Sequence, residues 1–174
     1  MRKNLLVLVL FSAGFLLCSF QKASAQKNDL NLLMGGNLIL GFPTGDFKNG
    51  YSSATGVDAF LGFGISRQAF LVGTIGYSSY KNEDTNPYGK IKLIPLKAGL
   101  RLYPAKKLFI AGNAGVGFLK DETMSSRESR FVYDLGLGLH GQIVQAGVYY
   151  DGWKRKNNNG TSNTIQVRIG LALR

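Results

Sequence analysis

Hydrophobic and non-hydrophobic residues alternate with a period of two along most of this chain. The last run is the clearest, because aliphatic side chains occupy every second position from Ile165 to Leu173 and small or charged residues lie between them. Such alternation is typical of a β-strand with two unlike faces, whereas a helical face repeats every 3.6 residues. We count eight such runs and predict an all-β fold; the runs cover residues 30–42, 57–65, 71–77, 94–102, 108–118, 131–139, 144–150 and 165–173.

Long and short connections alternate between these runs. The long connections cover residues 42–56, 81–90, 120–129 and 153–163, and the short ones cover residues 66–69, 104–107 and the neighbourhood of Gly141. In an antiparallel meander, this alternation places every long loop at one end and both ends of the sheet-forming chain at the other. Outer-membrane barrels have this layout, with long extracellular loops and short periplasmic turns.

The fourth run has an irregular phase. Ile91, Leu93 and Pro95 are out of step with the residues from Ile94 to Leu102. Proline has no N–H to donate to a strand ladder, so we predict a β-bulge or a strand start near Pro95.

Glycine and charge share the face opposite the aliphatic side chains. The chain has 23 glycines. A soluble barrel would have to fit the aliphatic face into an interior that eight strands leave just wide enough for side chains, and its glycines would face solvent without a purpose. A barrel in lipid turns the aliphatic face outward and avoids the ~2–4 kcal/mol that Arg or Lys costs at the bilayer midplane. The pattern therefore favours an eight-stranded antiparallel up-and-down transmembrane β-barrel over a soluble one.

Two sets of residues take roles in this interpretation. The charged residues of the glycine face are expected to form a structural network in the lumen, or alternatively a proton or ion path: Asp58, Lys97, Arg101, Asp134 and Arg168. Aromatic residues near the ends of the runs are expected to form interfacial belts: Phe42, Phe63, Phe70, Tyr77, Tyr80, Tyr103, Phe118, Phe131, Tyr150 and Trp153.

The first 25 residues have the features of a cleaved signal peptide. Arg2 and Lys3 precede an apolar stretch, and Ala23-Ser24-Ala25 offers small residues to a signal peptidase. We expect residues 26–174 to form the barrel domain and to lack cysteine, which excludes disulfides and thiolate metal sites. The alternative is a lipoprotein anchored through Cys18, although Leu17 before it is not small.

Few residues point to catalysis, metal binding or nucleic-acid binding. His140 is the only histidine, and its run contains no serine to act as a nucleophile, so we expect no enzymatic activity and no cofactor or metal. The net charge is +11, but the Lys and Arg residues are spread along the chain rather than gathered on one nucleic-acid-binding face. One basic cluster, Lys154-Arg155-Lys156, is either a solvated loop tip or a contact for lipopolysaccharide phosphates.

The chain resembles the small eight-stranded OmpA/OmpX-like outer-membrane β-barrel family. The resemblance rests on Gly41-Phe42-Pro43-Thr44-Gly45-Asp46-Phe47, on Ile94-Pro95-Leu96-Lys97-Ala98-Gly99-Leu100-Arg101 and on the amphipathic last run. It implies export to the outer membrane, insertion by the barrel-assembly machinery and contact with outer-membrane lipid and lipopolysaccharide. It also implies a monomer that lacks the soluble domain of the longer family members. The loops of this barrel would then be free to contact an extracellular ligand.

The expected function is that of a structural, surface-exposed envelope component in the outer membrane, with an interior filled by side chains. The alternative is a small-ligand binding or narrow transport barrel, either porin-like or soluble in the periplasm.

Overall fold

The computed structural model describes residues 31–82, 89–121, 128–155 and 160–174. The signal peptide predicted for residues 1–25, with Cys18, lies outside the described residues. Among the residues that are described, no helix is both long and apolar enough to cross a membrane.

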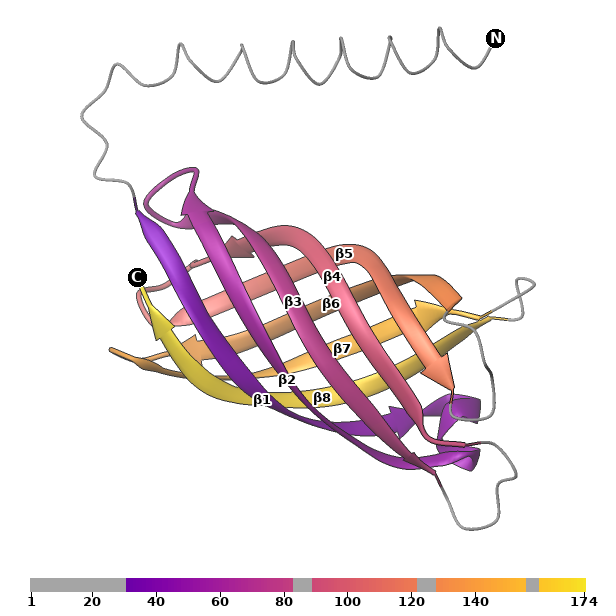
Figure 1. The fold of residues 1–174 in the computed structure, drawn as a ribbon. Helices are drawn as coiled ribbons and strands as arrows, with labels where there is room; N and C mark the ends of the chain where they lie inside the picture. The colour runs from indigo at the N-terminus through magenta and orange to yellow at the C-terminus, as the bar shows by residue number, and fades with distance from the viewer. Residues whose placement is uncertain (1–30, 83–88, 122–127, 156–159) are drawn as a thin grey trace, which may run out of the picture. The chain divides into compact units, whose positions relative to one another are not determined.

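Eight antiparallel strands close into one barrel in the order β1 to β8, with β8 pairing back onto β1 (Figure 1). This confirms the up-and-down barrel predicted from the alternating runs. A short 3-10 helix, η2 (Gly45–Asn49), joins the first two strands. The strands are β1 (Leu32–Thr44), β2 (Tyr51–Gly64), β3 (Ala69–Asn82), β4 (Ile91–Leu102), β5 (Leu108–Asp121), β6 (Glu128–His140), β7 (Val144–Lys154) and β8 (Thr161–Leu173).

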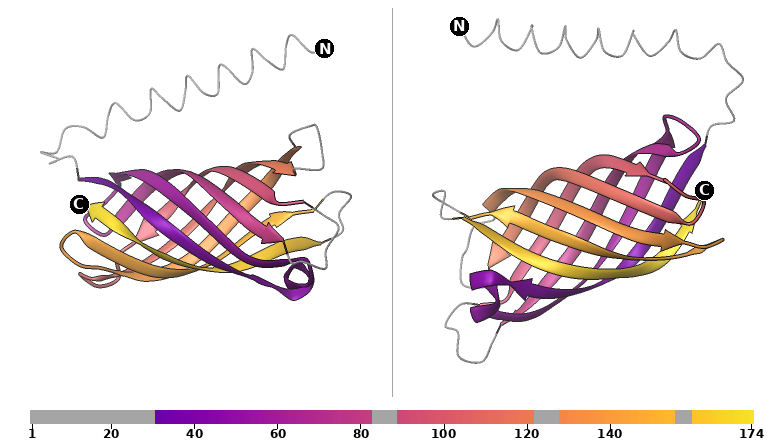
Figure 2. Two further views of the ribbon diagram at one scale, coloured as in Figure 1. Left: turned by 60° about the horizontal axis from the view of Figure 1, so that its bottom comes forward. Right: turned by 180° about the vertical axis from the view of Figure 1, so that it is seen from behind.

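The two ends of the barrel differ. At one end, short turns join β2 to β3, β4 to β5 and β6 to β7, and β8 finishes there; we call this the turn end. At the opposite end η2 joins β1 to β2, and β3, β5 and β7 finish there; we call it the loop end. Figure 2 shows η2 and the end of β8 at opposite ends of the barrel in both views.

The first predicted long loop, residues 42–56, is mostly strand. Strand β1 continues to Thr44 and β2 begins at Tyr51, so only η2 and Gly50 connect them. The polarity of the faces inverts in this part of β2: Tyr51 and Ala54 point inward and are buried, whereas Ser52 and Thr55 are exposed. The alternation pattern, which rests on aliphatic residues of the outward face, therefore does not identify residues 51–56 as strand.

The β-bulge or strand start predicted near Pro95 is absent, because β4 begins at Ile91 and runs through Pro95 without a break. The β3–β4 pairing keeps one register on both sides of Pro95, and the β4–β5 pairing runs through it without a shift. Leu93 is only 2% exposed because it points into the barrel near the loop end. The irregular hydrophobic pattern therefore arises because Leu93 is a hydrophobic residue on the inward face, and the strand itself has no irregularity. An irregularity in register lies instead on β2, between Tyr51 and Ser53.

The outer and inner faces have opposite polarity. Outward side chains in the middle of the strands are aliphatic or aromatic and exposed, with Leu38 at 67% and Leu135 at 62%. Inward side chains include every one of the five charged residues expected in the lumen, each 8% exposed or less. The sheet therefore has its apolar surface outside and its charges inside, as the alternation predicted.

Candidate functional site

The interior of the barrel contains a polar layer between two apolar clusters. The turn-end cluster is formed by Leu33, Phe60, Phe70, Val72, Tyr103, Phe109, Ala111, Tyr149 and Ala172. The loop-end cluster is formed by Phe47, Tyr51, Ala54, Tyr80, Leu93, Val132 and Trp153. The ionisable and amide side chains of the strands meet between them, so the polar layer is the candidate site.

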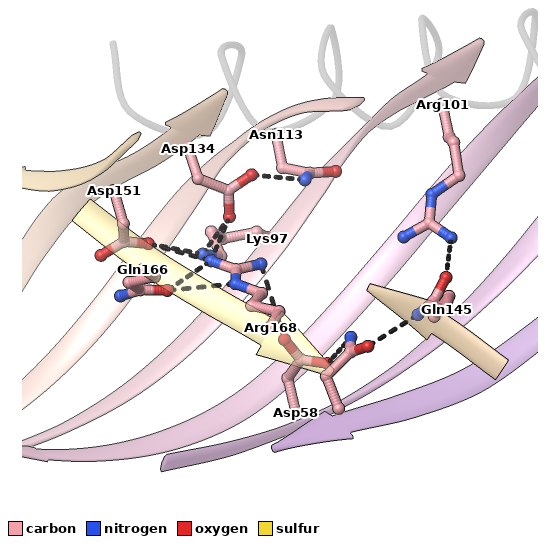
Figure 3. A network of polar contacts seen from close by, with 10 residues as sticks. Asp58, Lys97, Arg101, Asn113, Asp134, Gln145, Asp151, Gln166 and Arg168 are labelled. Atoms are coloured by element: carbon pink, nitrogen blue, oxygen red, sulfur yellow. Dashed lines mark hydrogen bonds and ion pairs between the residues drawn. The ribbon is translucent and has the colours of Figure 1, made fainter. Parts of the chain in front are cut away.

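Two cations and two carboxylates meet at the centre of the polar layer (Figure 3). Lys97 Nζ on β4 forms an ion pair with Asp134 on β6 and a second one with Asp151 Oδ2 on β7 at 3.0 Å. Arg168 on β8 donates from Nη2 to the same oxygens, at 3.2 Å to Asp134 and 3.4 Å to Asp151. Each cation is therefore shared by both carboxylates, and each carboxylate by both cations.

Arg168 extends the network toward a third carboxylate. Its Nη1 lies 3.5 Å from Asp58 Oδ2 on β2. Its Nε and Nη2 also donate to Gln166 Oε1, at 3.0 and 2.8 Å, and its guanidinium stacks 4.0 Å from the centre of the Tyr149 ring. A guanidinium has five donors in a rigid plane, and this one is held by partners from four strands.

Arg101 lies apart from this centre. Its Nη1 donates to Gln145 Oε1 at 2.9 Å, and its guanidinium lies between the rings of Phe60 and Phe109, 4.5 and 4.4 Å from their centres. A chain of amides links it to the rest. Gln145 Nε2 donates to Asn37 Oδ1 at 2.7 Å, and Asn37 Nδ2 donates to an Asp58 oxygen at 2.6 Å.

The structure thus brings together Asp58, Lys97, Asp134 and Arg168, but it joins Arg101 to them only through amides. The alternation places Asp151 on the glycine face as well, but the predicted network left it out; it completes a balance of three buried cations and three buried carboxylates among the described residues. The predicted network also left out the bridging amides. The strand phase could have identified these residues, because each of them lies at an inward position of its own strand: Asn37, Asn113, Gln145, Asp151 and Gln166.

The aromatic residues near the strand ends do not all face lipid, which corrects the prediction of interfacial belts. Phe70, Tyr80, Tyr103 and Trp153 are buried inside the barrel, none more than 3% exposed. Others, such as Phe42, are exposed on the outer face. The phase of each strand distinguishes the two sets, since Phe70 and Tyr80 alternate with the outward residues of β3.

Phe47 closes the loop end of the interior. It belongs to η2 rather than to a strand, and yet it is 6% exposed, because η2 folds over the barrel mouth. Its ring centre lies 4.8 Å from that of Tyr51, 5.0 Å from Trp153 and 5.5 Å from Tyr80. These contacts bind the β1–β2 connection to β2, β3 and β7.

His140 has two structural partners at the turn end. Its Nε2 donates to the carbonyl of Ala172 at 3.2 Å, which leaves Nδ1 to accept from the Tyr103 hydroxyl at 2.8 Å. The guanidinium of Arg174 lies over the Tyr103 ring, 4.3 Å from its centre. Both ring nitrogens of His140 are thus engaged in holding strand ends together.

Small cavities border the polar layer. Two cavities of about 10 Å³ lie beside it, and Asp58, Thr74 and Arg168 line both. A cavity needs roughly 10–15 Å³ to hold one water molecule, so each has room for about one water. Within the described part of the chain, no three His, Cys, Asp or Glu residues gather in a way that could hold a metal ion.

The predicted basic cluster lies where β7 ends, at the loop end. Lys154 is exposed, and Arg155 is half-buried and donates from Nε to Ser162 Oγ at 3.0 Å. Lys156 lies outside the described residues.

No protein-family model matches the chain, and no curated protein matches it in sequence. Solved structures match its fold. The attachment invasion locus protein Ail of Yersinia pestis aligns with a TM-score of 0.55 at 14% identity, over 82% of this chain and 97% of that one. The N-terminal β-barrel domain of Pseudomonas aeruginosa OprF aligns with a TM-score of 0.55 at 16% identity, over 83% and 98%.

Neisserial surface protein A aligns with a TM-score of 0.51 at 11% identity, over 81% of this chain and 94% of that one. At such identities the likeness concerns the fold, which these proteins share over nearly their whole length. The chain has the closed eight-stranded fold of the small outer-membrane β-barrel proteins.

Proposed function

We propose that this chain is an integral outer-membrane protein with a structural, surface-exposed role and no enzymatic activity. The observation that carries the proposal is the inverted polarity of the barrel. Its exposed face is a continuous band of aliphatic and aromatic side chains around all eight strands, and the charges of the strand centres are inside. Soluble monomers rarely expose contiguous apolar patches larger than a few hundred Å².

Closure of the sheet supports the same proposal. A bilayer provides no water for unpaired backbone N–H and C=O groups, and a closed barrel satisfies them between strands. Each of the eight strands pairs with two neighbours. The short turns then lie on the periplasmic side and the loop end faces the cell exterior, as in other barrels of this type.

The interior favours a plugged barrel over a transport or ligand-binding one. Two apolar clusters close the polar layer from both ends, and the cavities beside it have room for about one water each. We expect no sizeable conductance in planar bilayers. Large, stable channels formed by the purified protein would support the transport alternative instead.

Membrane insertion is tested by fractionation and by electrophoretic mobility. The protein should be recovered with outer membranes, and the unheated sample should migrate differently from the boiled one, because a folded barrel resists detergent. Recovery in the soluble periplasmic fraction, or identical mobility before and after heating, would contradict the proposal.

Lys154 and Arg155 support lipopolysaccharide as a partner at the loop end, with Lys156 as the third cation of the cluster. Several neighbouring cations add their attraction for phosphates. A second crystal structure of Ail, which aligns at 16% identity, is a complex with the heparin analogue sucrose octasulfate. We expect the triple variant Lys154→Gln, Arg155→Gln, Lys156→Gln to bind lipopolysaccharide more weakly than the wild type while it keeps its heat-dependent mobility. Unchanged binding would identify the cluster as a solvated loop tip.

Insertion by the barrel-assembly machinery and a monomeric state complete the proposal. Each has its own test. Depletion of the machinery should leave the protein unfolded, and the folded protein in detergent should have the mass of one chain.

A further inference from the structure

Backbone hydrogen bonds join the turns at the turn end into a continuous rim. The Tyr103 N–H donates to the carbonyl of Gln68 at 2.7 Å, so the β4–β5 turn is held against the β2–β3 turn. The His140 N–H donates to Lys107 O at 2.7 Å, and the Ala172 N–H donates to Ile143 O at 2.7 Å. These hydrogen bonds fix the turns relative to one another, so the side chains on the rim have fixed neighbours.

The rim is basic. Arg67 lies on the β2–β3 turn, Lys106 and Lys107 lie on the β4–β5 turn, and all three are exposed. None of the three turns, residues 65–68, 103–107 and 141–143, contains an Asp or Glu. The hydrogen bond from Tyr103 to Gln68 places the first two turns side by side, so the three cations lie on adjacent turns.

Exposed aliphatic residues lie within the same turns. Ile65 is 66% exposed and Ile143 is 52% exposed. Each continues the apolar outer surface beyond the end of its strand, next to outward residues such as Phe63 and Val144. The apolar surface therefore reaches the rim, which places Arg67, Lys106 and Lys107 at the level of lipid headgroups rather than beyond them.

We propose that this rim is a docking site for anionic phospholipid headgroups, such as phosphatidylglycerol, in the leaflet that surrounds the turn end. The proposal rests on the membrane insertion argued above and adds a lipid preference to it. Phosphate matches the rim chemically, because Arg presents a planar fork to phosphate oxygens and Lys adds point charges. The neighbouring isoleucines favour a lipid over a soluble polyanion, since only a lipid offers acyl chains to them.

The test compares two variants with equal charge loss. Arg67→Gln, Lys106→Gln, Lys107→Gln removes the rim cations, and Lys81→Gln, Lys90→Gln, Lys120→Gln removes three exposed cations from the loop end. Each full-length protein is folded into detergent, and binding of phosphatidylglycerol and of phosphatidylcholine is measured by native mass spectrometry. We expect the wild type to prefer phosphatidylglycerol, and the rim variant to bind it about a hundredfold more weakly, because each of the three lost cations contributes roughly fivefold near an anionic surface.

The loop-end variant should retain the affinity of the wild type, and added salt should weaken binding of the wild type more than that of the rim variant. Unchanged affinity in the rim variant, or equal losses in both variants, would overturn the inference. Equal binding of soluble inositol hexakisphosphate would identify the rim as a polyanion site and also overturn it. Failure of membrane insertion itself would be visible separately, as loss of heat-dependent mobility in the wild type and both variants.

Discussion

Asp134 is a carboxylate that pairs with two buried cations, Lys97 and Arg168. It accepts from Lys97 and from Arg168 through one oxygen and from Asn113 Nδ2 through the other, at 2.6 Å in the last case. Its side chain is fully buried. Loss of one partner from a buried ion pair leaves a charge without compensation, which costs more than the pair contributes.

We therefore expect Asp134→Asn to lower the free energy of unfolding by about 3–5 kcal/mol. Urea titration of the protein in lipid vesicles measures this, with the fluorescence of Trp153, the only tryptophan of the chain, as the signal. Glu128→Gln is the matched control, because it removes a carboxylate from the partly exposed Glu128–Arg130 pair at the loop end. That change should cost about 1 kcal/mol or less. Equal effects of the two variants would show that burial of the network is unimportant for stability.

Interior glycines permit the close approach of neighbouring strands. A Cβ added at Gly115 would overlap the carbonyl oxygen of Leu96 on β4, whereas one added at Gly73, which faces outward, would have its nearest neighbour at 3.9 Å. Overpacking of this kind costs about 1–3 kcal/mol. Gly115→Ala should therefore lower the urea midpoint and the folding yield in vesicles, and Gly73→Ala should leave both unchanged. The reverse order would contradict the assignment of the two faces.

At the scale of elements, η2 and the strand ends around it act as a plug. Phe47 contacts rings from β2, β3 and β7, so this short helix links strands that are not adjacent in the barrel. Trp153 contacts the rings of both Phe47 and Tyr80 and is 3% exposed. Its fluorescence is therefore a local probe of the plug.

Phe47→Ala should shift the emission of Trp153 to longer wavelength and lower stability by about 3 kcal/mol, since truncation of a buried Phe leaves a cavity. Phe42→Ala is the control: Phe42 lies five residues earlier and is 57% exposed on the outer face. The control should leave the emission of Trp153 unchanged. An unshifted spectrum in Phe47→Ala would mean that η2 does not close the barrel mouth.

The alternating pattern was sufficient to predict the number of strands and their apolar outward face, because aliphatic residues occupy that face in the middle of each strand. It failed toward the loop end, where hydrophobic residues such as Tyr51 and Leu93 point inward. It also placed Lys97 and Arg168 on the correct face. Their partners come from strands across the lumen, however, and strand phase does not specify which inward side chains meet there.

At the scale of the whole molecule, the barrel has the polarity of a soluble protein turned inside out. The three buried cations, Lys97, Arg101 and Arg168, are balanced by three buried carboxylates, and hydrophobic side chains surround the outside. A charge added to the outer face should therefore affect a membrane protein and a soluble protein in opposite ways. Leu135 is suited to this comparison, because it lies near the middle of β6 and is 62% exposed.

We expect Leu135→Arg to lower the free energy of unfolding in vesicles by about 2–4 kcal/mol, since an arginine at the bilayer midplane must leave water. Leu135→Ala is the control for loss of the leucine side chain and should cost less. Both are measured by urea titration after folding into phosphatidylcholine vesicles. In a soluble barrel, Arg at this exposed position would be tolerated and would reduce aggregation, because it interrupts an exposed apolar patch. A Leu135→Arg variant as stable as Leu135→Ala would therefore contradict the membrane assignment, whatever the interior of the barrel contains.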